Sequence, residues 1–189
     1  MSMSGKIWLS SDLHFCHDRE FVWGPRGFTS VEAHNEIIVQ NFNDLVKPED
    51  DVYLLGDLML NDNQVGFELL NQLNGKLHLI RGNHDTDTRW NLYRQLPKVV
   101  EMDDVIRLKY NGYHFYLSHY PTLTANLEKE SLKVIEINLY GHTHQNTNFY
   151  MDMPFMYHVG LDSHQNSPVL LDDIIEHCKN KVIECKEML

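Results

Sequence analysis

Five short apolar runs, each followed at once by a polar motif, constrain this chain more than any other feature. In chain order the motifs are Asp12-Leu13-His14, Gly56-Asp57, Gly82-Asn83-His84-Asp85, His119 and Gly141-His142-Thr143-His144. Each run has the length of a β-strand, so each motif is expected at the end of a strand. The carboxyl ends of neighbouring strands converge on one crevice, and residues far apart in sequence can therefore share one site.

Segments with a helical pattern lie between and after these runs. The first helix is predicted to open at Thr29, with Glu32 completing a capping box, and to present Ile38, Phe42 and Leu45 on its apolar face. Further helices are predicted over residues 64–73, 87–96, 125–133 and 172–179.

The order of these elements predicts an α/β fold. Strands alternate with helices early in the chain, and closely spaced strands follow near residues 105–119 and 135–161, which favours a layered sandwich with two mixed sheets. A chain of 189 residues, of which 42% are hydrophobic, is about one domain long. Residues 1–189 are therefore expected to form a single domain.

The composition and charge of the chain indicate which partners it is expected to bind and in which cell compartment it is expected to work. A formal net charge of -11 opposes a stable complex with nucleic acid, because the field repels phosphate backbones. No segment approaches the ~20 apolar residues that span a bilayer, and the start of the chain is unlike a signal peptide. Cys16, Cys178 and Cys185 are odd in number and form no C-x-x-C pair. A soluble protein of the reducing cytoplasm is expected.

The motifs carry the residue types that bind metal ions. An Asp-x-His pair at a strand end can place a carboxylate and an imidazole on one cation. Asp57, after a tight turn at Gly56, offers two oxygens that can bridge two cations ~3.5 to 4 Å apart. Asn83 adds an amide oxygen, and His142 and His144 repeat the alternate-residue geometry. Each piece alone is commonly structural, but the ordered combination indicates a site with two metal ions.

This ordered set of motifs resembles the calcineurin-like metallophosphoesterase superfamily, and most closely its small bacterial and phage phosphoesterases without a cap. The resemblance implies a four-layer αββα sandwich of two mixed sheets. It also implies that one metal is held by Asp12, His14, Asp57 and His144, and the other by Asp57, Asn83, His119 and His142. Oxygen and imidazole ligands without a thiolate suit manganese, iron, zinc or nickel, and manganese is favoured.

The activity that the resemblance implies is the hydrolysis of a phosphoric ester. A hydroxide shared by the two cations attacks phosphorus in line with the leaving oxygen. His84, which is not a ligand by the resemblance, is placed to stabilise the transition state or to protonate the leaving group, and Asp85 to orient its ring. His158 and Asp162 end a further apolar run, where a structural role is expected.

The substrate is less constrained than the metal site. The segment after the first motif contains Phe21, Trp23 and Arg26; Trp23 could stack a base and Arg26 could hold a second phosphate, although packing under a loop explains them equally well. His17 could contact the substrate or serve only the surrounding structure. The first hypothesis is a phosphodiesterase acting on a small nucleotide-like ester. The alternatives are a phosphomonoesterase or nucleotidase with the same site, and a non-catalytic binding scaffold on this fold.

Overall fold

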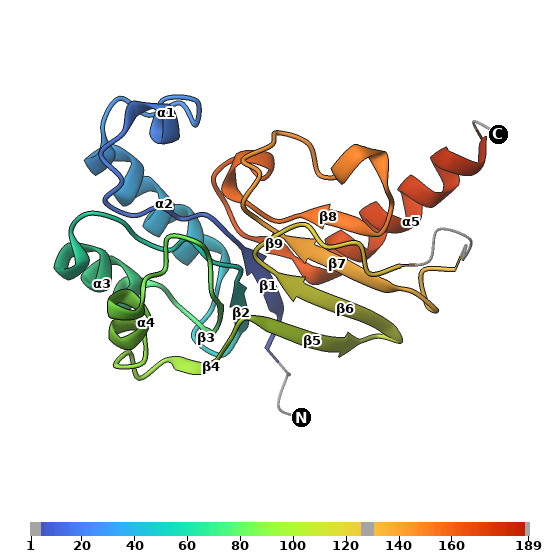
Figure 1. Ribbon diagram of the computed structural model, residues 1–189, viewed down its shortest axis with the longest axis horizontal. Helices are drawn as coiled ribbons and strands as arrows, with labels where there is room; N and C mark the ends of the chain where they lie inside the picture. The colour runs from blue at the N-terminus through green and yellow to red at the C-terminus, as the bar shows by residue number, and fades with distance from the viewer. Residues whose placement is uncertain (1–4, 126–130, 188–189) are drawn as a thin grey trace.

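A computed structural model describes residues 5–125 and 131–187 and shows two β-sheets with flanking helices (Figure 1). Within these residues the first sheet has the strand order β4-β3-β2-β1-β9 and the second β5-β6-β7-β8. The strands of the first sheet are β1 (Ile7–Ser10), β2 (Asp51–Leu54), β3 (Lys76–Ile80), β4 (Val99–Asp103) and β9 (Val169–Leu170). Those of the second are β5 (Val105–Tyr110), β6 (Tyr113–Ser118), β7 (Glu136–Tyr140) and β8 (Met156–His158).

Both sheets are mixed. Strands β1 to β4 run parallel and β9 is antiparallel to β1. In the second sheet β5 is antiparallel to β6, while β6, β7 and β8 are parallel. This arrangement confirms the predicted α/β fold with two mixed sheets.

The helices cover the sheets with apolar faces. On one face of the first sheet lie α2 (Val31–Leu45), α3 (Asn63–Gln72) and α4 (Asp87–Tyr93), which share a buried core with Trp8, Val52 and Leu77. Helix α5 (Leu171–Glu187) packs into the other core, which contains side chains from both sheets. Short helical segments complete the list: α1 (Glu20–Trp23), η1 (Tyr150–Asp152) and η2 (Leu161–Ser163). Every helix in the described ranges is too short or too polar to cross a lipid bilayer.

The start of α2 corrects one prediction. Its N-cap is Ser30 rather than Thr29, because the Ser30 hydroxyl accepts a hydrogen bond from the backbone N–H of Ala33. At the other end Leu45 is 40% exposed, and the buried position there belongs to Val46. The rest of the predicted apolar face, Ile38 and Phe42, is buried.

Other helix ends also differ from their predictions. Helix α3 begins and ends one residue earlier, at Asn63 and Gln72, because Asp62 caps its amino terminus. Helix α4 ends at Tyr93 instead of Leu96. Helix α5 continues to Glu187 instead of stopping at residue 179, since Val182 still packs against the core of the second sheet. The helix expected over residues 125–133 falls largely on residues 126–130, outside the described part of the chain.

Strand direction places the motifs together. The parallel strands β1, β2 and β3 end at one edge of the first sheet, where the backbone N–H of Asp12 donates to the carbonyl oxygen of Gly56. The second sheet reaches the same edge through a bridge between Ser11 and Gly160. The backbone N–H of His142 donates to Oδ2 of Asp12 at 2.9 Å and ties β7 to the first motif. The ends of both sheets therefore meet at a single place.

Candidate metal centre

Seven side chains converge where the ends of the two sheets meet. One group consists of Asp12, His14 and His144, the other of Asp57, His119 and His142, and in each the ligand atoms lie within 4.8 Å of one another. Asn83 joins the second group: its Oδ1 lies 2.9 Å from Nε2 of His119 and 2.9 Å from Nδ1 of His142. The structure thus brings together all seven residues that the sequence proposes as ligands.

Asp57 lies between the two groups. Its Oδ2 is 3.9 Å from Nε2 of His14 in the first group and 3.5 Å from Nε2 of His119 in the second. Burial alone would raise the pKa of this carboxyl, but the hydrogen bond and positive charge of His119 lower it below the usual value. An ionised carboxylate in this position can bridge two cations.

The buried polar atoms of the first group fit a cation. Oδ1 of Asp12 is fully buried and has no hydrogen-bond partner in the described residues. Nε2 of His14 lies 3.1 Å from Nε2 of His144, and Nε2 of His144 lies 3.8 Å from Oδ1 of Asp12. A buried carboxylate oxygen without a donor is costly unless a positive charge is bound beside it. The donor set of carboxylate, imidazole and amide oxygen matches a divalent metal.

The backbone at the ligands is unusual. Left-handed φ values between 47° and 66° occur at Asp12, His14, Asp57, His142 and His144. A non-glycine residue in this region costs on the order of 1–3 kcal/mol, and such strain persists where surrounding contacts hold it, commonly at functional sites. Here those contacts include the hydrogen bond from the backbone N–H of His14 to the carbonyl oxygen of Asp57.

Two glycines allow the loops to approach each other. A Cβ atom at Gly82 would lie 2.2 Å from Oδ1 of Asp57, and one at Gly141 would lie within 2.4 Å of Oδ2 of Asp12. No side chain larger than hydrogen fits at either position without moving a ligand. The glycines in these motifs are therefore part of the site's geometry.

Asp162 orients the candidate ligand His144. Its Oδ2 lies 3.0 Å from Nδ1 of His144, and the guanidinium of Arg26 donates to both of its oxygens, at 3.0 and 2.9 Å. Burial alone would raise the pKa of the Asp162 carboxyl, but the hydrogen bonds from His144 and Arg26 hold it well below its usual range. A carboxylate behind a histidine ligand fixes its tautomer and ring orientation, so Asp162 has a more direct role than sequence reasoning gave it.

Arg26 does not fit its predicted substrate role. Its side chain is 1% exposed, and beyond the pair with Asp162 it donates to the backbone oxygen of Asp12 at 2.9 Å. Nη1 lies 3.1 Å from Nε2 of His34. Burial and the charge of Arg26 lower the pKa of His34 to about 4, so that this ring is neutral and accepts the hydrogen bond. The guanidinium is committed to the structure beneath the site, and the prediction that it holds a second phosphate is wrong.

Replacing Asp162 tests this support. Asp162→Asn keeps the shape but removes the charge that faces Arg26 and orients His144. We expect metal affinity to fall by ~10 to 100-fold, the usual cost of losing such a partner. Breaking a buried ion pair should also cost about 3 kcal/mol of unfolding free energy. Metal titration and urea unfolding measure the two effects, and a variant with unchanged metal affinity would show that His144 does not depend on Asp162.

Asp85 contacts a different part of the site than predicted. Oδ2 of Asp85 accepts hydrogen bonds from the backbone N–H groups of Asp57, at 2.8 Å, and Gly82, at 2.9 Å. Oδ1 accepts from the backbone of Leu58 and from the hydroxyl of Tyr93. None of these bonds reaches the ring of His84, so the expectation that Asp85 orients that ring is wrong. Asp85 instead fixes the turn that carries Asp57.

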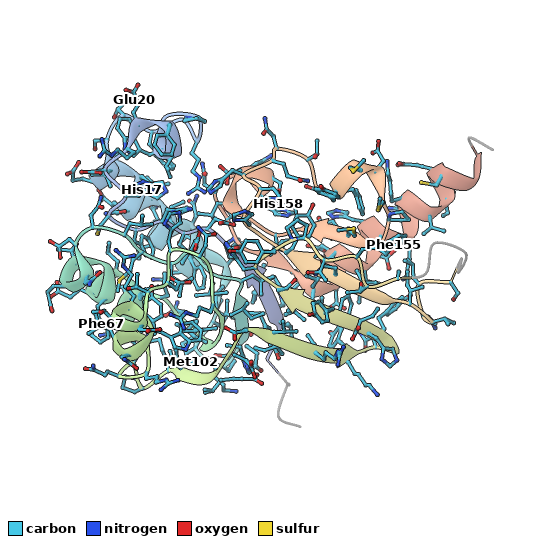
Figure 2. All side chains as sticks on the ribbon, in the orientation of Figure 1. His17, Glu20, Phe67, Met102, Phe155 and His158 are labelled. Atoms are coloured by element: carbon cyan, nitrogen blue, oxygen red, sulfur yellow. The ribbon has the colours of Figure 1, made fainter. Side chains whose placement is uncertain are left out.

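His84 lies at the exposed side of the centre, and His17 is largely buried beside it. Nε2 of His84 is 3.9 Å from Oδ2 of Asp57, and the side chain is 43% exposed. The ring of His17 lies 5.2 Å from that of His14 and 6.4 Å from that of His84, measured between centroids. Figure 2 labels His17 near α1 and His158 on the second sheet. Both rings therefore lie beside the candidate ligands His14 and Asp57, and a contact with substrate stays a prediction.

In the segment after the first motif the exposed aromatic ring is that of Phe21, whereas Trp23 was predicted to stack a base. Trp23 is half-buried, and its indole N–H is shielded from solvent without a hydrogen-bond partner among the described residues. Phe21 is 73% exposed, and its ring packs edge-on to His17 at 5.5 Å. Stacking of a base by Trp23 remains a prediction, but Phe21 is the better placed ring.

His158 fits its expected structural role. The residue is fully buried, and its Nδ1 lies 2.7 Å from the Ser163 hydroxyl. Burial lowers the pKa of the ring to about 3, so it stays neutral. It packs beside Gly160 at the bridge that joins the two sheets.

The sequence and fold of this chain are similar to those of known proteins. Residues 6–160 match the calcineurin-like phosphoesterase superfamily domain. An uncharacterized protein of Methanocaldococcus jannaschii is 34% identical over 192 residues, which cover 97% of each chain. The crystal structure of a protein of unknown function from Aquifex aeolicus has a similar fold, with a TM-score of 0.67 and 22% identity over 91% of this chain and 98% of that one. An archaeal phosphodiesterase is similar at a TM-score of 0.49 and 19% identity, over 88% of this chain and 99% of that one.

Proposed function

The chain belongs to the calcineurin-like phosphoesterase superfamily, and we propose that it is a dinuclear phosphodiesterase acting on a small nucleotide-like ester. The observation that carries the proposal is the position of Asp57, whose Oδ2 is within 3.9 Å of histidine nitrogens of both ligand groups. The free cysteines Cys16, Cys178 and Cys185 support a place in the reducing cytoplasm.

The proposal assigns four ligands to each of two divalent ions. We assign the first ion to Asp12, His14, Asp57 and His144, and the second to Asp57, Asn83, His119 and His142. When bound, the ions supply positive charge for the phosphoryl oxygens and a water of lowered pKa as the nucleophile. Manganese suits the oxygen and nitrogen ligands, and iron, zinc or nickel are the alternatives.

His84 is assigned to the leaving group. Its backbone is fixed on both sides, because its N–H donates to Oδ1 of Asp57 at 2.8 Å and its carbonyl accepts from Arg89 at 2.6 Å. The exposed ring beside Asp57 can then present Nε2 to the departing oxygen and transfer a proton to it. No protein nucleophile is needed for the reaction.

The charges around the site favour a diester over a monoester. Four arginines lie near the centre, and each has a partner elsewhere: Arg19 with Asp18, Arg26 with Asp162, Arg81 with Asp87, and Arg89 with backbone and amide oxygens. In the described residues we find no unpaired arginine that could meet the second negative charge of a monoester. A diester has a single charge on its phosphoryl oxygens, which the two metal ions can neutralise. The net charge of -11 further disfavours polyanions.

A panel of substrates tests the proposal. With manganese supplied, we expect kcat/KM for bis(p-nitrophenyl) phosphate to exceed that for p-nitrophenyl phosphate by about tenfold or more, which corresponds to ~1.4 kcal/mol of differential transition-state binding. Cyclic and linear nucleotide diesters complete the panel. Faster hydrolysis of monoesters would favour the nucleotidase alternative. Metal binding without hydrolysis of any ester would favour the binding scaffold.

A further inference from the structure

A cavity of about 420 Å³ lies next to the metal centre, on the side of His144. Pro25, Asn146, Ser163 and Gln165 contribute to its walls, together with the paired Arg26 and Asp162. Its volume falls within the range of small-molecule binding pockets. His144 belongs both to this wall and to the first ligand group: its Nδ1 faces Asp162 in the wall, at 3.0 Å, and its Nε2 faces His14 in the ligand group, at 3.1 Å. The cavity and the first ligand group therefore adjoin each other across one imidazole ring.

The cavity has no net charge. Arg26 and Asp162 form a bidentate pair, in which the two charges neutralise each other. The remaining wall residues apart from His144 are uncharged. A second phosphate would find no free cation here, so the occupant best suited to this cavity is a neutral group.

Two side-chain amides in the wall are free to bind such a group. Ser163 uses its hydroxyl on His158 and on the backbone oxygen of Gly160, at 2.7 and 3.2 Å. For Asn146 and Gln165, by contrast, no side-chain hydrogen bond to another described residue is found, and both residues are exposed. Each amide offers two N–H donors and one oxygen acceptor. These are the groups that read the edge of a nucleobase, while Pro25 adds an apolar surface beside them.

We propose that this cavity binds the uncharged nucleoside half of a nucleotide diester, with Asn146 and Gln165 as specificity-determining residues. The proposal rests on the proposed function and adds to it the chemical class of one ester substituent. The phosphoryl group then lies at the metal centre, and the second substituent departs on the side of His84.

The test compares two esters that share one leaving group. These are the p-nitrophenyl ester of thymidine 5′-monophosphate, which carries a nucleoside, and bis(p-nitrophenyl) phosphate, which carries none. For Asn146→Ala and for Gln165→Ala we expect KM for the nucleoside ester to rise about fivefold, the worth of one neutral hydrogen bond, with kcat unchanged. Both parameters for bis(p-nitrophenyl) phosphate should stay unchanged. Gln95→Ala, an exposed glutamine that does not line the cavity, is the matched control.

A second measurement does not depend on hydrolysis. Metal-free protein labelled with ¹⁵N is titrated with thymidine, and the side-chain amide signals of Asn146 and Gln165 are expected to shift while that of Gln95 stays in place. Equal changes in KM for the two esters, no change in either, or unmoved amide signals would overturn the inference. If the wild-type protein hydrolyses neither ester, the proposed function fails, and the titration with thymidine alone decides whether the cavity binds a nucleoside.

Discussion

Asp57→Asn is expected to abolish hydrolysis and to strip the protein of both metal ions. Asp57 is the one residue assigned to both ions, and its Oδ2 lies within 3.9 Å of histidines in both groups. The substitution keeps the shape but removes the negative charge that the two cations share. Its effect should exceed the ~10 to 100-fold loss typical of a residue behind a ligand. Metal content per chain and kcat/KM for a nitrophenyl diester measure it.

A charge-matched control separates this effect from a change in net charge. Asp44→Asn alters the exposed surface of α2 by the same charge and lies outside both ligand groups. It should keep wild-type metal content and activity. Two tightly bound ions with most of the activity in Asp57→Asn would show that the bridging assignment is wrong.

His84→Asn is expected to keep both metal ions and to lose rate selectively. General acid assistance is typically worth ~100 to 10,000-fold, and it matters most when the departing oxygen is strongly basic. An alkoxide such as a ribose hydroxyl needs the proton, whereas a nitrophenolate hardly does. The variant should therefore lose far more kcat on a nucleotide diester than on a nitrophenyl ester, provided that chemistry limits both reactions.

The metal content of His84→Asn and its loss of rate on the two esters distinguish between possible roles of His84. Equal losses on both esters would mean that His84 stabilises charge in the transition state and does not donate the proton. Loss of a metal ion would place His84 among the ligands. His114→Asn, on β6 and outside both groups, controls for the loss of an imidazole.

The sequence predicts that the motifs lie together, because the carboxyl ends of neighbouring parallel strands lie at one edge of a sheet whatever their side chains are. Once the apolar runs are taken as strands, Asp12, Asp57 and Asn83 must emerge at one edge. The structure brings them together with the histidines as expected. Neither the left-handed φ values nor the bridge between Ser11 and Gly160 could be predicted, since the first are held by contacts between loops and the second is a contact between the two sheets.

The supporting residues were harder to assign, because their roles depend on partners far away in sequence. Arg26 is 136 positions from its partner Asp162, and nothing near either residue indicates the pair. Asp85 follows directly on His84, which suggested a contact between neighbours, yet its carboxylate binds the backbone of Asp57. The sequence did contain one signal for Asp162: together with His158 and Gly160 it forms a His-x-Gly-x-Asp motif at the end of a predicted strand.

The observed helix ends differ from the predicted ones for a local reason. Thr29 and Ser30 are both good N-caps, and only the backbone geometry selects Ser30. Leu45 continues the apolar spacing of α2 but lies in its last turn, beyond the edge of the core. Periodicity locates a helix more reliably than it locates its last residue.

Titration of the metal-free protein with Mn²⁺, followed by metal analysis and by hydrolysis of bis(p-nitrophenyl) phosphate, tests the central claim most directly. The two ligand groups predict binding of about two ions per chain, with activity appearing only as the second is bound. Full activity with one ion, or activity that survives complete removal of metal, would contradict a dinuclear site that uses Asp57 as its bridge.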